Sequence, residues 1–68
     1  MDSSEAKSII EAVIFAADGP VSIDQLARVI DELDGENIAR LIREMQQEYN
    51  AAQRGFQIVE IANGFQMC

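Results

Sequence analysis

Residues 9–17 read Ile-Ile-Glu-Ala-Val-Ile-Phe-Ala-Ala, and Glu11 is the only polar residue among them. A helix that turns about 100° per residue gathers most of their apolar side chains, with those of flanking residues, on one arc. Phe15 falls on the opposite side, together with Glu11 and other polar residues. The segment therefore predicts a helix that is buried along its arc and covered a second time at Phe15. The arc consists of Ala6, Ile9, Ile10, Val13, Ile14 and Ala17.

The ends of this helix carry local signals. Ser3 or Ser4 can cap its start, and Glu5 would then lie near the positive end of the helix dipole. The helix is expected to end near Ala17, because the glycine and proline of residues 18–20 cannot continue it.

A second helix has the sharpest start in the chain. Ser22 and Gln25 have the spacing of a capping box, and Val21 and Leu26 have the spacing of a hydrophobic staple across the same cap. These signals predict a helix that begins at Ile23. Its apolar face consists of Ile23, Leu26, Ala27 and Ile30.

A third, longer helix is expected after a tight connection. The second helix ends near Asp31, Asp34 can cap the third, and Glu36 lies in its first turn. Gly55 is expected to end this helix, with Arg54 near the negative end of the dipole. Its apolar stripe consists of Ile38, Leu41, Ile42, Met45, Tyr49 and Ala52.

The last segment predicts a β-hairpin. Residues 56–61 are rich in β-branched and aromatic types, Asn63-Gly64 is a preferred pair for a two-residue turn, and residues 65–68 form a second strand that includes Cys68. Both faces of this hairpin carry apolar groups, and either face could pack on the helices. One face carries Phe56, Ile58, Glu60, Phe65 and Met67, and the other carries Val59, Ile61, Gln66 and Cys68.

Three helices followed by a hairpin predict an α+β fold, a winged helix-turn-helix with the hairpin as its wing. We expect one such domain over residues 1–68. A single core is marginal at this length, and association with another chain is one way to add stability.

The charge balance favours protein partners over nucleic acids. Twelve acidic residues against five basic ones give a formal charge of −7, which repels phosphate backbones. In the third helix, which reads DNA in many winged helices, Arg40 stands four residues from both Glu36 and Glu44, so its charge is offset. A DNA-binding transcriptional regulator is the alternative function. The outward face of this helix carries Glu36, Arg40, Arg43, Glu44 and Gln47.

Catalytic and metal-binding residues are scarce. The chain has no histidine and one cysteine, Cys68, so no internal disulfide, nucleophilic site or cofactor site is expected. The acidic run of residues 31–36 does not have the spacing of a calcium loop. Apolar runs are too short to span a bilayer and the start of the chain does not resemble a signal peptide, so a cytoplasmic, non-enzymatic protein is expected.

Phe15 remains the residue that the fold does not explain. The hairpin could fold over it, or it could form a subunit contact in which one hairpin face also takes part. The candidate dimer or partner interface consists of Phe15, Ala12, Ala16, Phe56, Phe65 and Met67.

Two segments resemble the bacterial segregation and condensation protein B (ScpB) family. Residues 11–22 read Glu-Ala-Val-Ile-Phe-Ala-Ala-Asp-Gly-Pro-Val-Ser, and residues 55–66 read Gly-Phe-Gln-Ile-Val-Glu-Ile-Ala-Asn-Gly-Phe-Gln. Both are similar to motifs of the first of the two winged-helix domains in that family, and the resemblance covers most of the chain.

The resemblance implies a non-enzymatic subunit of the bacterial condensin complex, acting in chromosome segregation and condensation. It also implies a cytoplasmic, nucleoid-associated protein that forms homodimers through this domain and binds the kleisin subunit, which bridges the heads of the SMC ATPase. The sequence matches only the first winged-helix domain. The kleisin contact is expected mainly from the second.

Overall fold

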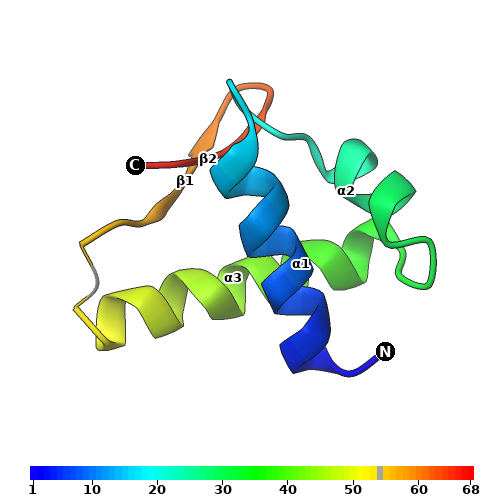
Figure 1. Ribbon diagram of the computed structural model, residues 1–68, viewed down its shortest axis with the longest axis horizontal. Helices are drawn as coiled ribbons and strands as arrows, with labels where there is room; N and C mark the ends of the chain where they lie inside the picture. The colour runs from blue at the N-terminus through cyan, green and yellow to red at the C-terminus, as the bar shows by residue number, and fades with distance from the viewer. Residues whose placement is uncertain (54) are drawn as a thin grey trace.

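A computed structural model of the chain describes residues 1–53 and 55–68. These residues form helices α1 (Ser3–Ala16), α2 (Ile23–Val29) and α3 (Gly35–Ala51), followed by strands β1 (Ile58–Ile61) and β2 (Gly64–Met67). Figure 1 shows α1 crossing α3, with α2 near the start of α3 and the hairpin beyond the end of α1. The expected winged helix-turn-helix is therefore confirmed.

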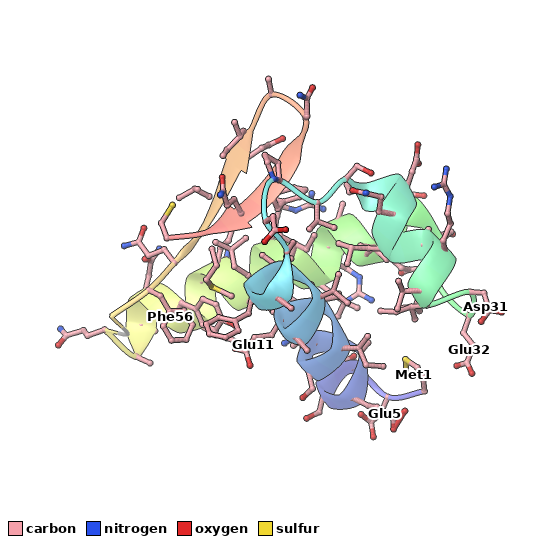
Figure 2. The ribbon with its side chains drawn as sticks, turned by 45° about the horizontal axis from the view of Figure 1, so that its top comes forward. Met1, Glu5, Glu11, Asp31, Glu32 and Phe56 are labelled. Carbon is pink, nitrogen blue, oxygen red and sulfur yellow. The ribbon has the colours of Figure 1, made fainter. Side chains whose placement is uncertain are left out.

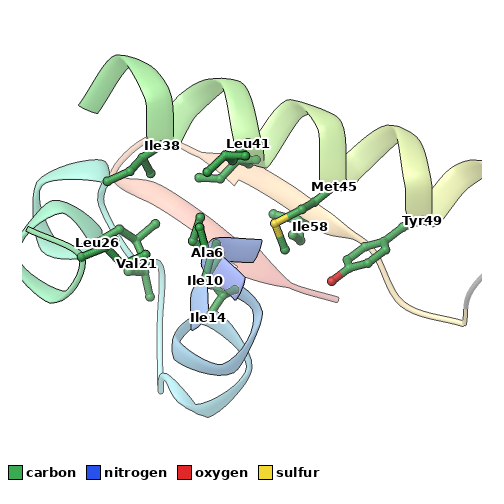
Figure 3. Packing of buried hydrophobic residues seen from close by; sticks show 12 residues of the cluster. Ala6, Ile10, Ile14, Val21, Leu26, Ile38, Leu41, Met45, Tyr49 and Ile58 are labelled. Carbon is green, nitrogen blue, oxygen red and sulfur yellow. The ribbon is translucent and has the colours of Figure 1, made fainter. Parts of the chain in front are cut away.

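The core lies where the three helices meet and the hairpin closes over them. Ile10, Leu26, Ile38 and Ile42 are completely buried, and Ile58 is the strand residue that completes the cluster (Figure 3). The predicted apolar arc of α1 is confirmed, because each of its residues is buried or packs against this cluster. The buried residues are Ala6, Ile10, Ile14, Val21, Leu26, Ile30, Ile38, Leu41, Ile42, Met45, Tyr49 and Ile58.

The first helix begins one residue earlier than its predicted caps allow. Asp2 is the N-cap, and its Oδ1 accepts a hydrogen bond of 2.8 Å from the backbone N–H of Glu5. Ser3 and Ser4 lie inside the first turn, so the prediction that one of them caps α1 was wrong. A carboxylate at the N-cap also interacts favourably with the helix dipole, which explains the preference for Asp2.

The starts of α2 and α3 confirm the predicted caps. Ser22 Oγ accepts from the backbone N–H of Gln25 at 3.1 Å, and Gln25 Oε1 accepts from the N–H of Ser22 at 2.8 Å. Asp34 Oδ1 accepts from the N–H of Asn37 at 2.8 Å. Each cap is built within four consecutive residues, which is why the local sequence was sufficient to locate it.

Helices α2 and α3 end before the predicted positions. Helix α2 ends at Val29, two residues before Asp31. Helix α3 ends at Ala51, and Gln53 follows with a φ of 54°, the left-handed conformation that often ends a helix. Gly55 is therefore not the residue that stops α3, and Ala52 is exposed instead of continuing the buried stripe. The predicted interaction of Arg54 with the dipole lies outside the described residues.

The hairpin turn differs from the prediction by one position. Ile61 pairs with Gly64, so the two turn residues are Ala62 and Asn63 and the strands span 58–61 and 64–67 instead of 56–61 and 65–68. Gly64 is required for another reason. Its φ is +152°, and a Cβ there would lie 2.3 Å from the carbonyl oxygen of Val21.

Val21 extends the sheet by one pair. Its N–H and C=O exchange hydrogen bonds of 2.8 Å with the C=O and N–H of Phe65. This bridge holds the hairpin against the connection between α1 and α2. The backbones of Val21 and the hairpin can approach this closely only because residue 64 is a glycine and has no Cβ.

The register still gives the two predicted faces. The face with Ile58 and Met67 packs on the helices, and Phe56 and Phe65 are half-buried there. Glu60 shares that face and is exposed, because it lies near the turn. Cys68 is exposed after the end of β2, so the expectation of an apolar strand residue was wrong.

Candidate protein-interaction surface

Phe15 is the most exposed large apolar side chain among the described residues, with 74% of its surface accessible. The hairpin does not fold over it, so that interpretation was wrong for this chain. Val29 and Ile61 are also exposed, at 56% and 41%, but they lie on α2 and at the end of β1. The prediction that Phe15 forms a subunit contact is the interpretation that remains.

A hollow of about 270 Å³ lies beside Phe15. Glu11, Ala12 and Phe15 from the outer side of α1 form one wall, and Phe56 and Met67 from the hairpin segment form the other. Figure 2 shows Glu11 and Phe56 on the same side of the molecule. We call this feature the Phe15 hollow. Its lining is apolar except for the carboxylate of Glu11. Such a lining is typical of a surface that contacts another protein and not of a site for a polar substrate.

The interior wall of the Phe15 hollow is held by an aromatic pair. The rings of Tyr49 and Phe56 meet edge to face, with centroids 5.4 Å apart and planes at 76°. The hydroxyl of Tyr49, which is buried, donates a hydrogen bond to Oε2 of Glu11. This chain of contacts fixes both Phe56 and Glu11 relative to α3, so the hollow is formed before any partner arrives.

The structure brings together four of the six predicted interface residues. Phe15, Ala12, Phe56 and Met67 line the Phe15 hollow. Ala16 is exposed at the end of α1, next to Phe15 but outside the lining. Phe65 packs against the core and bridges to Val21, so most of its role is structural. Whether these residues bind a partner stays a prediction.

Sequence reasoning missed two residues of this surface. The sequence periodicity placed Glu11 on the polar side of the first helix and Tyr49 on the apolar stripe of the third, and it did not connect the two. A buried tyrosine usually needs a hydrogen-bond partner for its hydroxyl, and a lone acid in an apolar helix segment is a natural candidate for that partner. These two residues could therefore have predicted, from the sequence, a contact between α1 and the end of α3.

Part of the polar surface of α3 forms ion pairs, whereas Arg43 is exposed and, within the described residues, has no ion pair. Lys7 of α1 reaches across to Glu48 at 2.6 Å and to Glu44 at 3.2 Å, and Arg40 pairs with Glu44 at 2.8 Å. The hydrogen bonds that the Lys7 ammonium donates to Glu48 and Glu44 raise the pKa of Lys7. The pKa of Glu44 is lowered, mainly by Lys7 and to a smaller extent by Arg40. A second guanidinium nitrogen of Arg40 donates to Asn37 at 3.4 Å. The predicted ion pair between Arg40 and Glu44, four residues apart on α3, is therefore present.

Two other kinds of site are not found in the part of the chain that the structure describes. Residues 1–53 and 55–68 contain no group of three or more acidic, histidine or cysteine side chains placed to hold a metal ion. Within the same residues, none of the helices has the length and apolar character needed to cross a bilayer.

Residues 8–68 match the family described as segregation and condensation complex subunit ScpB. The chain belongs to this family. Its relatives include the segregation and condensation protein B of Syntrophotalea carbinolica, which is 49% identical over 67 residues, covering 98% of this chain and 34% of the relative. The corresponding protein of Bacillus cereus strain AH187 is 43% identical over 63 residues, covering 91% of this chain and 33% of the relative. The chain thus spans about a third of the length of these proteins.

Solved ScpB structures have the same fold. The crystal structure of ScpB from Mycobacterium tuberculosis superposes with a TM-score of 0.90 at 26% identity, over all of this chain and 42% of that one. A crystal structure of a dimer of an ScpB N-terminal domain complexed with an ScpA peptide superposes with a TM-score of 0.85 at 35% identity, over 96% of this chain and 80% of that one. The described fold is therefore that of the ScpB N-terminal domain.

Proposed function

We propose that this chain is a non-enzymatic, homodimerising interaction domain that acts in chromosome segregation and condensation, in a complex with kleisin and SMC partners in the cytoplasm at the nucleoid. The observation that carries the proposal is the Phe15 hollow, with Phe15 itself 74% exposed at its edge. A small domain that leaves a large aromatic side chain beside an uncovered apolar recess gains stability when another protein surface covers both.

Family membership supports the biological role in this proposal. The related ScpB N-terminal domain that was crystallised as a dimer with an ScpA peptide supports both self-association and peptide binding by this domain. It also suggests that the kleisin contact need not be confined to a second domain. We further propose that the full-length protein carries that second winged-helix domain, because the relatives are about three times as long as this chain.

The charge distribution supports protein partners over DNA. The chain carries a formal charge of −7, and on α3 the side chain of Arg40 is already paired with Glu44. A helix that reads DNA needs cations that are available to phosphates and bases. Two chains of this charge also repel each other, so the proposed dimer must gain its stability from apolar contact.

Sedimentation equilibrium between 1 and 100 µM, at 50 and 500 mM salt, tests the proposal. We expect a monomer–dimer equilibrium that shifts towards dimer at high salt, because screening weakens the repulsion between the two acidic chains. A chain that stays monomeric at 100 µM in both buffers would contradict the homodimer.

Duplex DNA in the same experiment tests the alternative of a DNA-binding regulator. That function requires binding at 50 mM salt that weakens steeply at 500 mM and is reduced when Arg40 and Arg43 are replaced by glutamine. We expect no binding at either salt concentration. The opposite salt responses of the two functions make the experiment decisive.

A further inference from the structure

The size of the Phe15 hollow limits what can fill it. Its volume of about 270 Å³ lies below the range of about 300–1,000 Å³ that is typical of sites for small organic ligands. Its walls are apolar side chains with one carboxylate, so a phosphate or another anion is disfavoured by Glu11. One apolar side chain from a protein partner is the occupant that matches both the volume and the lining.

The lining favours an aromatic side chain in particular. Aromatic rings carry partial negative charge on their faces and partial positive charge at their edges, and they pack best edge to face. The ring of Phe56 already packs in this way on Tyr49, and the carboxylate of Glu11, held by the hydroxyl of Tyr49, lies on the opposite wall of the hollow. A ring inserted between them can turn its edge towards the carboxylate and a face towards Phe56.

Phe15 is an aromatic side chain placed where a second copy could use it. It lies at the rim of the hollow, is 74% exposed, and is flanked by Ala12 and Ala16, whose small side chains allow close approach. In a twofold dimer the same surface patch of each copy meets the other. A residue that protrudes beside a recess on one copy can therefore enter the recess of the second copy, and the reverse contact forms at the same time. A single symmetric contact then covers both rings and fills both hollows.

We propose that the Phe15 hollow is the receptor for Phe15 of a second copy, so that the two Phe15 rings are inserted reciprocally at one twofold interface. This inference rests on the proposed homodimer and adds the contact that forms it. Glu11 and Tyr49 act as positioning residues, because they hold the wall of the hollow. Ala12 keeps the hollow open, because a larger side chain at that position on α1 would occupy it.

Three variants test the insertion. Phe15→Ala removes the inserted ring, Ala12→Phe fills the hollow, and Val29→Ala is a matched control that truncates another exposed apolar residue outside the hollow. Phe15→Ala and Ala12→Phe each remove both ring-in-hollow contacts of the dimer. We expect each to weaken dimerisation by at least about 100-fold, and Val29→Ala to change it by less than about threefold.

A mixture of the first two variants gives the sharpest result. The Phe15→Ala chain keeps four of the five residues that line its hollow, and the Ala12→Phe chain keeps its Phe15 ring, so the mixed dimer regains one of the two contacts. Native mass spectrometry separates the mixed dimer from both homodimers by mass. We expect the mixed dimer to be about tenfold tighter than either variant homodimer, since half of the lost contact returns.

The outcomes separate this inference from the homodimer on which it rests. If the wild type is monomeric, both fail. If the wild type dimerises and Phe15→Ala dimerises equally well, the homodimer stands and the reciprocal insertion is wrong. If both variants are weakened and their mixture is no tighter than they are, Phe15 contacts some other part of the second copy, and the insertion is again wrong.

Folding of the variants is checked by far-UV circular dichroism and by urea unfolding at a concentration where the chains are monomeric. A second measurement does not depend on substitution. In a dimer mixed from isotope-labelled and unlabelled wild-type chains, the filtered NMR experiment should show a nuclear Overhauser effect from the Phe15 ring of one copy to the Met67 methyl of the other. Absence of this signal in a sample shown to be dimeric would overturn the insertion.

Discussion

The inner side of α1 is apolar, whereas the outer side is polar apart from Phe15 and the small Ala12 and Ala16, and the fold buries only the inner side. On the inner side, Ile10 is completely buried and Ile14 is 2% exposed. On the outer side, Phe15 is 74% exposed, although it is larger than either and adjacent to Ile14 in the chain. Local hydrophobicity therefore does not decide burial. The position of the side chain on the helix does, and the apolar surface that the fold cannot cover is available for association.

Truncation on the inner side gives the largest expected effect. Ile10→Ala should destabilise the chain by about 2–5 kcal/mol, because it removes buried methyl groups and leaves a cavity. A domain of this length has roughly 3–10 kcal/mol of stability in total, so we expect a large fraction of the Ile10→Ala chains to be unfolded at 37 °C. Urea unfolding followed by circular dichroism measures the change.

Phe15→Ala is the matched control on the outer side. Measured on monomeric chains at low concentration, it should change the free energy of unfolding by no more than about 0.5 kcal/mol. At high concentration it should lower the apparent stability, because the dimer that protects the folded state is weakened. A loss of several kcal/mol in the monomer would show that the two sides of α1 do not differ in the way described.

The wall of the Phe15 hollow that Phe56 and Met67 form depends on the position of the hairpin, and Gly64 allows the hairpin to approach Val21 closely. Gly64→Ala should destabilise the chain by about 1–3 kcal/mol from backbone strain, because its φ is +152° and the new Cβ would lie 2.3 Å from the carbonyl oxygen of Val21. Loss of the bridge between Val21 and Phe65 would also displace Met67, so dimerisation should weaken with it.

Gly19→Ala is the control for that substitution. The position has open space around it, and its stability should stay the same or rise slightly. Equal stability of Gly64→Ala and wild type in urea unfolding would mean that the close approach to Val21 is not needed to place the hairpin.

The sequence was most informative where a structure is built from neighbouring residues. The capping box of Ser22 and Gln25 and the cap at Asp34 were predicted correctly, because donor and acceptor are three residues apart. The two faces of the hairpin were also predicted, since side chains alternate along a strand and this alternation survived the shift of the turn from Asn63-Gly64 to Ala62-Asn63.

Prediction failed where distant segments decide the outcome. Gly64 looks like a turn residue in its local context, but it is glycine because Val21 approaches it from another part of the chain. Likewise, the sequence identified Phe15 as an apolar residue on the polar side of its helix. It did not predict the hollow beside Phe15, which exists only because the fold brings Phe56 and Met67 next to α1. Tertiary contacts of this kind leave little trace in local spacing.

The end of α3 offers a substitution with a smaller expected effect on stability. Gln53 has a φ of 54°, which costs a side chain about 1 kcal/mol and costs glycine much less. Gln53→Gly should therefore stabilise the chain by about 0.5–1 kcal/mol. In contrast, Gln47→Gly inside α3 should destabilise by about 1 kcal/mol. Thermal unfolding that shifted both variants in the same direction would contradict this assignment of the helix end.

The smallest expected effect concerns the ion pairs that join the polar side of α1 to α3. Lys7 forms ion pairs with Glu44 and Glu48. Because both carboxylates are exposed to solvent, which screens the attraction, Lys7→Met should lower stability only slightly. Its pH dependence is more informative than its size. Because the pKa of Glu44 is lowered below its ordinary value of 4.5, its stabilisation is present above that pH and is lost as the pH falls through the folded-state pKa.

The opposite sign applies to Lys7. Its pKa is raised above 10.5, so its stabilisation is present below that pH and is lost as the pH rises through the folded-state pKa. The difference in unfolding free energy between wild type and Lys7→Met should therefore be constant near neutral pH and shrink at both extremes. Arg28→Met is the control, since within the described residues Arg28 has no ion pair. A difference that persists unchanged at pH 3 would mean that Lys7 acts through the packing of its aliphatic stem, and that α1 has more inner surface than its apolar arc alone.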